Sequence, residues 1–210
     1  MSDALDRLGL TGVLTGVQSL SCWPPRRLAG RVVTVELGPV ATAPTSAPAP
    51  SPRHLGTAAI EAAAPGDVIV VAHQGKTDCA GWGGILSLAA QLRGVAGVIV
   101  DGACRDLDEA RELDFPLFGR AGVPLTARAR AVERSWGESV TVGDGLVVRT
   151  GDAVLADGSG VVFVAARDIE AVLAAAEEIF AREAAMARSI RDGAQPSVIM
   201  GRSYEELLHG

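Results

Sequence analysis

The sequence predicts an α/β fold with a parallel βαβ unit, antiparallel strands and a long C-terminal helix. Residues 68–72 and 98–100 are short apolar runs, rich in β-branched residues and bounded by Gly and Asp, which is typical of buried parallel strands. Between them, apolar residues from Ile85 to Leu92 recur at helical spacing. Further along, four short apolar segments separated by Gly and Asp precede a long Ala- and Glu-rich segment.

The elements before the βαβ unit follow from local signals. Ser2 is expected to cap a helix over residues 3–8 that ends at Gly9. A strand is predicted at residues 31–37 and a helix at residues 54–64, closed by Pro and Gly. Between them, residues 41–53 are dense in Pro, Ala and Ser, which predicts a mobile loop inside the domain.

The elements after the unit are also predicted in order. Residues 116–119 are expected to form a third parallel strand, and residues 120–136 are basic and irregular. Four antiparallel strands closing a small barrel or second sheet are predicted at residues 139–142, 145–149, 153–156 and 161–164. A long helix follows at 168–191, and residues 203–208 are expected to form a short final helix.

Composition bounds the class of protein. The 210 residues, 48% hydrophobic and 21% charged, fit a single domain over residues 1–210, with a C-terminal tail at 200–210. The net charge of −6 argues against nucleic-acid or anionic-membrane partners, since both need a basic face. No apolar run approaches the roughly 20 residues of a membrane span. Three widely separated cysteines fit neither a disulfide framework nor a metal knuckle, which favours a cytoplasmic location.

The carboxyl ends of the two central strands are the expected place for a ligand, because sites in parallel sheets gather at that edge. A Gly-rich loop at residues 73–83 leads into the helix, where the backbone N–H groups of Gly83, Gly84, Ile85 and Leu86 are expected to be free to bind an anion. Glycines also serve ordinary tight turns. The spacing of the glycines and Lys76 in this loop does not match the GxxxxGK(S/T) pattern of a P-loop.

Arg105 and Asp106 follow the second strand at the same edge. Together they offer a fork for a carboxylate and an oxygen ligand for a hard cation. The same pair also fits a helix N-cap Asp with an Arg over the sheet edge. Lys76 would suit a Schiff-base mechanism only if it were desolvated, and its Gly-rich surroundings favour a solvated lysine. By default, His73 and Trp82 are structural.

The ordered motifs GDVIVV, WGGIL, GVAGVIVDGACRD and DFPLFGR resemble those of the RraA-like / 4-hydroxy-4-methyl-2-oxoglutarate aldolase family. SDALDRLG, VTVGDGLVVRTGDAVLADGSGVVFV and EIFAREAAMARSIRDG extend the resemblance to nearly the whole chain. It implies a swivelling β/β/α domain. It also implies a homotrimer, or a hexamer of two trimers, with the active site at a subunit interface.

For activity, the resemblance implies a class II aldolase that uses Mg²⁺ or Mn²⁺. Such enzymes cleave 4-hydroxy-4-methyl-2-oxoglutarate or 4-carboxy-4-hydroxy-2-oxoadipate to pyruvate and a second 2-oxo acid, and they decarboxylate oxaloacetate. The expected partner is thus a small 2-oxo acid. Other members are regulators that inhibit ribonuclease E.

Carried over by position, the resemblance makes Asp106 the metal ligand and a catalytic residue. Arg105 would be catalytic and would bind the substrate carboxylate. The backbone of Gly83, Gly84, Ile85 and Leu86 would hold the pyruvyl carboxylate. Glu183, on the terminal helix, would reach the metal-bound water of a neighbouring subunit.

One departure from the family pattern keeps an alternative open. The aldolase branch usually has an acidic residue, as in WGELL, where this chain has Gly84. Losing an acid that orients metal-bound water typically costs 10–100-fold in metal affinity or activity. The chain keeps Asp106, which the regulator branch often loses. Ser159 also stands where many members have Asp. The alternative is therefore a non-enzymatic regulator or a member whose activity has decayed.

Overall fold

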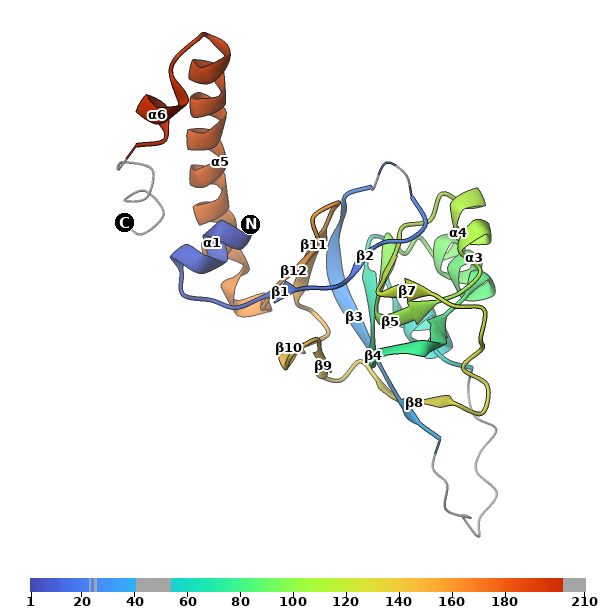
Figure 1. Cartoon of the computed structure of the whole chain (residues 1–210). Helices are drawn as coiled ribbons and strands as arrows, with labels where there is room; N and C mark the ends of the chain where they lie inside the picture. The colour runs from blue at the N-terminus through green and yellow to red at the C-terminus, as the bar shows by residue number, and fades with distance from the viewer. Residues whose placement is uncertain (23, 25, 41–53, 202–210) are drawn as a thin grey trace. The chain divides into compact units, whose positions relative to one another are not determined.

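The computed structural model describes residues 1–22, 24, 26–40 and 54–201 (Figure 1). The chain divides into two compact units. The sheet unit comprises Val13–Ala165, and the helical unit combines Met1–Gly12 with the chain from Ala166 onward. The prediction of a single domain over residues 1–210 stays a prediction.

Four parallel strands form the centre of the sheet unit. In spatial order they are β3 (Leu28–Pro39), β4 (Val68–Trp82), β5 (Gly97–Cys104) and β6 (Leu117–Gly119). Each pairs in parallel with the next. Every residue of β5 is buried, including the charged Asp101 beyond the apolar run predicted at residues 98–100. The βαβ unit and the third parallel strand are therefore confirmed.

Alternate residues of these strands pack on opposite faces of the sheet. On one face, Ile69 and Val71 join a core that includes residues of helices α2 (Thr57–Ala62), α3 (Gly84–Leu92) and α4 (Leu107–Glu112). On the other face, Val68 and Val70 join a core with residues of later strands, including Val140 and Phe163. Figure 1 shows α3 and α4 side by side beside β4 and β5.

Antiparallel strands extend the sheet on both sides. The order is β1-β12-β11-β3-β4-β5-β6-β2. Here β1 is Val13–Leu14, β2 is Gln18–Ser19, β11 is Ala153–Ala156 and β12 is Val161–Val164. The strands β9 (Val140–Val142) and β10 (Leu146–Val148) form a separate two-stranded sheet. The four predicted antiparallel segments are all strands, but two of them join the main sheet.

Two predictions in this unit were wrong. The expected loop at residues 73–83 is mostly strand, because β4 continues to Trp82. Register shifts keep it paired with β5, from Ala72 opposite Asp101 to Trp82 opposite Cys104. The segment 120–136, expected to be irregular, contains β7 (Ala121–Gly122), which pairs with β5, and β8 (Ala131–Trp136), which pairs with β3.

In the helical unit, α1 (Ser2–Arg7) packs with α5 (Ile169–Arg191). The helix α5 confirms the predicted long helix and follows a short 3₁₀ turn, η1 (Ala166–Asp168). Ser2 does not cap α1, because the helix begins at Ser2 itself with Met1 at the N-cap position. A short helix that was not predicted, α6 (Pro196–Ile199), follows α5.

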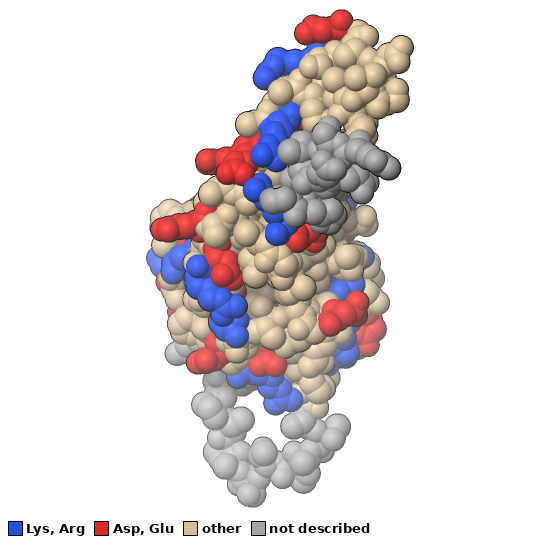
Figure 2. Space-filling view, turned by 90° about the vertical axis from the view of Figure 1, so that its left-hand side faces the viewer, with Lys and Arg blue, Asp and Glu red and all other residues tan. Residues whose placement is uncertain are grey.

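Other predictions differ in extent or stay open. The helix expected at residues 54–64 is the shorter α2. The loop at 41–53 and the final helix at 203–208 lie outside the described residues. Among the described residues, no helix is both long and apolar enough to cross a membrane. Figure 2 shows acidic and basic side chains interspersed on the visible face.

Candidate functional site

A cavity of about 530 Å³ lies at the carboxyl ends of β4 and β5. Its wall combines the end of β4, the first turn of α3, the residues that join β5 to α4, and the segment around the start of β8. All the residues predicted for the site within the sheet unit line it: Gly83, Gly84, Ile85, Leu86, Arg105 and Asp106. Its volume falls in the range usual for small-molecule sites, about 300–1,000 Å³.

Asp106 has an uncommon conformation for a residue with a side chain. Its φ of 55° is left-handed, a region that Asp tolerates better than most residues. It occupies the N-cap position of α4, yet its side chain does not cap that helix. Instead, Oδ2 accepts a hydrogen bond from the backbone N–H of Gly84 at 2.9 Å. The Nε atom of Arg105 lies 3.3 Å from the same oxygen. Asp106 therefore joins the starts of α3 and α4.

The two glycines at the start of α3 allow this close approach. A Cβ atom on Gly83 would lie 2.9 Å from Asp106 Oδ2 and 3.1 Å from Arg105 Nε. A Cβ atom on Gly84 would lie 3.1 Å from the Cβ of Asp106 and 3.3 Å from that of Glu109. Any side chain at position 84 would thus press on Asp106 and α4. The absence of a side chain at Gly84 therefore allows Asp106 to approach the start of α3.

The predicted anion cradle is smaller than expected. The N–H of Gly84 already donates to Asp106. The N–H groups of Ile85 and Leu86 belong to the first turn, where a helix provides no acceptor. Within the described part of the chain, no other hydrogen bond is seen for these two groups. Both groups are available as donors to a carboxylate.

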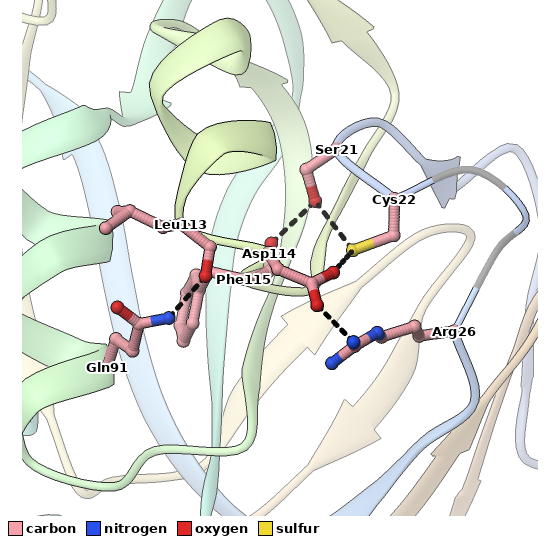
Figure 3. Close-up of polar contacts among 7 residues, drawn as sticks. All are labelled: Ser21, Cys22, Arg26, Gln91, Leu113, Asp114 and Phe115. Atoms are coloured by element: carbon pink, nitrogen blue, oxygen red, sulfur yellow. Dashed lines mark hydrogen bonds and ion pairs between the residues drawn. The ribbon is translucent and has the colours of Figure 1, made fainter.

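The helices that carry the site are also joined at their far ends (Figure 3). The side-chain Nε2 of Gln91, in α3, donates to the carbonyl of Leu113, just after α4. The next residue, Asp114, accepts from Arg26. Ser21 Oγ donates to the carbonyl of Phe115 at 2.6 Å. Contacts at both ends of α3 and α4 hold Arg105 and Asp106 against the first turn of α3.

Another part of the cavity wall is formed by the start of β8 and the residues before α2, which are far apart in the sequence. Glu133, in β8, accepts a hydrogen bond from the backbone N–H of Gly56 through Oε2 at 2.7 Å. A Cβ atom on Gly56 would lie 2.8 Å from the ring of Trp82. That ring is buried, and its N–H donates to Ser87 Oγ at 3.1 Å. These contacts bring His54 into the cavity wall as well.

Sequence reasoning missed Glu133, His54 and Arg128 as lining residues. They come from segments far apart in the sequence. The pairing of β8 with β3 brings Glu133 opposite Leu37. Residues 131–136, Ala-Val-Glu-Arg-Ser-Trp, do not alternate between apolar and polar side chains, so no clear sequence signal marks the strand that carries Glu133.

His73 and Lys76, also considered as candidates from the sequence, do not line the cavity. His73 is buried, and its Nε2 donates to the carbonyl of Cys79 at 3.0 Å. Burial lowers the pKa of His73 and raises the pKa of the Cys79 and Cys104 thiols, so all three groups favour their neutral forms. Lys76 has its Nζ 3.7 Å from Asp78 and lies on an exposed part of β4.

The described residues fit one kind of metal site only. They contain no group of three or more His, Cys, Asp or Glu that could hold a metal ion. A closed cage of protein ligands is thus absent from this part of the chain. Mg²⁺, however, is often held by one or two carboxylates, with water and substrate completing its coordination. Asp106 fits that arrangement. Glu183 is exposed on α5 in the helical unit, and its role with a neighbouring subunit stays a prediction.

Comparisons with known proteins agree with the observed fold. The family model RraA-like: Aldolase/RraA matches residues 1–164. A Halalkalibacterium halodurans protein named "Putative 4-hydroxy-4-methyl-2-oxoglutarate aldolase" is 33% identical over 148 residues, which cover 70% of this chain and 68% of that protein. For the first two curated relatives, the alignments span 64% and 68% of the relative's length.

Solved structures match more of the chain. An uncharacterized protein of Pseudomonas syringae pv. tomato has a TM-score of 0.82 at 29% identity, covering 95% of this chain and 90% of that one. Streptomyces coelicolor RraAS2, described as an unusual member of the RNase ES inhibitor RraA protein family, has a TM-score of 0.72 at 27% identity, with coverages of 88% and 89%. These matches confirm the mixed α/β fold with its long C-terminal helix.

Proposed function

The chain belongs to the RraA-like family, and from that premise we propose that it is a metal-dependent carbon–carbon lyase acting on 2-oxo acids. The proposed reactions are cleavage of 4-hydroxy-4-methyl-2-oxoglutarate or 4-carboxy-4-hydroxy-2-oxoadipate to release pyruvate, and decarboxylation of oxaloacetate. Curated relatives named as aldolases support a lyase at the level of the family. The observation that carries the proposal is the meeting of Arg105, Asp106 and the first turn of α3 in one cavity.

The first turn of α3 and Arg105 provide the substrate-binding groups. The N–H groups of Ile85 and Leu86 suit a carboxylate, because the start of a helix carries partial positive charge. The guanidinium of Arg105 lines the same cavity, half exposed, and can pair with a second oxygen of the 2-oxo acid. Binding at both points would fix the scissile bond relative to Asp106.

Asp106 is the proposed metal ligand. A divalent cation bound there would supply a Lewis acid that polarises the 2-oxo group. The chain's own contribution is to hold the carboxylate in place, through the Gly84 N–H and the Arg105 side chain. Cleavage of the carbon–carbon bond leaves negative charge on the pyruvate half. The positive charge of Arg105 stabilises that charge without needing to move.

A second candidate function is a non-enzymatic regulator of the ribonuclease-inhibitor type. Two observations favour it: the similarity to RraAS2 and the glycine at position 84, where an acid would assist a metal-bound water. The retained Asp106 lines the cavity and is held by one hydrogen bond from Gly84 and an ion pair with Arg105, which favours the enzyme.

A pyruvate-release assay distinguishes the two. Purified protein with Mg²⁺ or Mn²⁺ should release pyruvate from oxaloacetate above the rate of the metal alone, and EDTA should stop it. 4-Hydroxy-4-methyl-2-oxoglutarate should be cleaved under the same conditions. Absence of turnover across these substrates by folded protein would refute the lyase. Inhibition of RNA cleavage by a ribonuclease E-type enzyme would then support the regulator.

Lys76→Ala provides the control for an amine mechanism. Lys76 does not line the cavity, so the variant should keep full turnover. Metal-independent turnover that disappears in Lys76→Ala would replace the metal mechanism with a Schiff base.

A further inference from the structure

Arg128 is a second arginine in the wall of the cavity, on the turn between β7 and β8. It is exposed on the protein surface, and no role has been assigned to it so far. Arg105 at the start of α4 and Arg128 on this turn are the two guanidinium groups that line the cavity. Two such groups in one small cavity provide separate places for two anionic groups.

The charges that line the cavity are not equally available. The carboxylates of Asp106 and Glu133 each accept a backbone N–H, from Gly84 and Gly56 respectively. Arg105 lies beside Asp106, with 3.3 Å between Nε and Oδ2. Within the described ranges, Arg128 makes no ion pair within 4.0 Å. Arg128 is thus the positive charge in the cavity wall that the fold has not already paired.

The turn that carries Arg128 is held by hydrogen bonds. The N–H groups of Arg130 and Ala131 donate to the carbonyl of Ala127 at 2.8 and 2.9 Å. Ala129 has a φ of 59°, a left-handed conformation that is costly for a residue with a Cβ atom. Such strained residues are concentrated at functional sites, where the surrounding structure holds them in place.

The neighbouring arginine of the same turn is used differently. The Nη1 of Arg130 donates to the carbonyls of Thr126 and Arg128, at 3.3 and 3.1 Å. Its guanidinium therefore fastens the turn, and it does not line the cavity. This difference makes Arg130 a matched control for Arg128, with the same charge and the same turn.

We propose that Arg128 selects dicarboxylic 2-oxo acids by binding the carboxylate at the far end of the substrate. The inference rests on the proposed function, in which Arg105 and the first turn of α3 hold the 2-oxo acid end. A 2-oxo acid with a neutral end would leave Arg128 without a partner and would gain nothing from it. Hydrogen bonds to charged groups contribute about 1.5–3 kcal/mol, which corresponds to roughly a tenfold to hundredfold preference.

Binding of two ligands that cannot react tests the inference. 2-Oxoglutarate has carboxylates at both ends, whereas 2-oxopentanoate has the same chain length and a methyl group at the far end. Neither carries a hydroxyl group for aldol cleavage or a carboxylate placed for decarboxylation. Calorimetric titration of the protein with each ligand, in the presence of Mg²⁺, should show about tenfold or greater preference for 2-oxoglutarate.

Arg128→Met should remove most of that preference, by weakening 2-oxoglutarate binding and leaving 2-oxopentanoate binding within about twofold. Arg128→Lys should restore part of it, and Arg130→Gln, which removes the same charge from the turn but keeps N–H donors for its carbonyls, should keep it. Equal affinities in the unaltered protein, or an unchanged preference in Arg128→Met, would overturn the inference. The titration reads binding alone, so absence of turnover would refute the lyase without deciding the role of Arg128.

Discussion

Two aspartates on or just after β5 each contact one arginine and one backbone N–H, but one is buried and the other is partly exposed. Asp101 accepts from Arg120 Nε at 2.6 Å and from the backbone N–H of Gly143 at 2.9 Å. Asp106 lies 3.3 Å from Arg105 Nε and accepts from the N–H of Gly84 at 2.9 Å. The side chain of Asp101 is 2% exposed, whereas that of Asp106 is 28% exposed and lines the cavity.

The difference shows how burial decides between structure and chemistry. A buried carboxylate must be fully paired, because taking a charge out of water costs several kcal/mol. Asp101 meets that condition and ties β5 to the turn between β9 and β10, which form no ladder with the main sheet. Asp106 keeps solvent access, so a ligand can reach it. We therefore expect substitutions at Asp101 to affect folding and those at Asp106 to affect function.

The largest expected effect is on stability, at Asp101. Asp101→Ala would leave Arg120 and the Gly143 N–H without their acceptor, so the free energy of unfolding should fall by about 3–5 kcal/mol. Urea denaturation followed by circular dichroism measures this. Asp106→Asn is the control and should cost at most about 1 kcal/mol, because the Arg105–Asp106 pair is partly exposed and Asn keeps an acceptor for the Gly84 N–H and tolerates the left-handed φ. Equal losses in the two variants would contradict the comparison.

A smaller effect is expected where α3 meets Asp106. In a helix, Gly→Ala usually stabilises by roughly 0.5–1 kcal/mol. At Gly84 the new Cβ would lie 3.1 and 3.3 Å from two Cβ atoms that are fixed to the backbone of Asp106 and Glu109. Gly84→Ala should therefore destabilise, by about 1–3 kcal/mol. Stabilisation, measured by the same urea titration, would show that position 84 has free space and that an acid there could be tolerated.

The smallest expected effect is a pH dependence of stability that comes from the buried His73. Burial lowers the pKa of His73, so the unfolded chain takes up a proton before the folded one. The contribution of His73 is therefore constant above its ordinary pKa of about 6.5, and stability falls as the pH drops below that value, until the lowered pKa is passed. Between the two pKa values, the contribution of His73 to the free energy of unfolding should change by up to about 1.4 kcal/mol per pH unit, the value for one proton.

His73→Gln removes this proton. As the pH falls from 7.5 to 5, the stability measured by thermal unfolding should decrease more steeply in the unaltered protein than in His73→Gln. A difference between the two slopes of up to about one proton supports the lowered pKa, whereas parallel curves would show that His73 has the same pKa in the folded and unfolded chain.

Much of the sheet unit could be predicted from the sequence because its signals are local. The β-branched runs of β4 and β5 and the helical spacing of α3 each lie within one short segment. The position of Arg105 and Asp106 followed from the same strands. The pairing of β8 with β3, which brings Glu133 into the cavity wall, depends on contacts between distant segments. No local pattern carries that information.

The glycines at the start of α3 also make a contact with a distant segment that the sequence alone could not reveal. Their sequence suggested free N–H groups and a missing acid at Gly84. The structure shows that Gly84 donates to Asp106 and that its missing side chain is what permits the contact. That relation involves two helices and the left-handed conformation of Asp106, so spacing along the chain could not reveal it.

The central claim is that Asp106, held by the Gly84 N–H and Arg105, makes this cavity a metal-dependent lyase site. The most direct test is pyruvate release from oxaloacetate with Mn²⁺ by Asp106→Asn, which preserves size and removes the charge. We expect the protein-dependent rate to fall about 100-fold or more while the urea midpoint stays nearly unchanged. Turnover within about threefold of the unaltered protein, in a variant that remains folded, would contradict the claim.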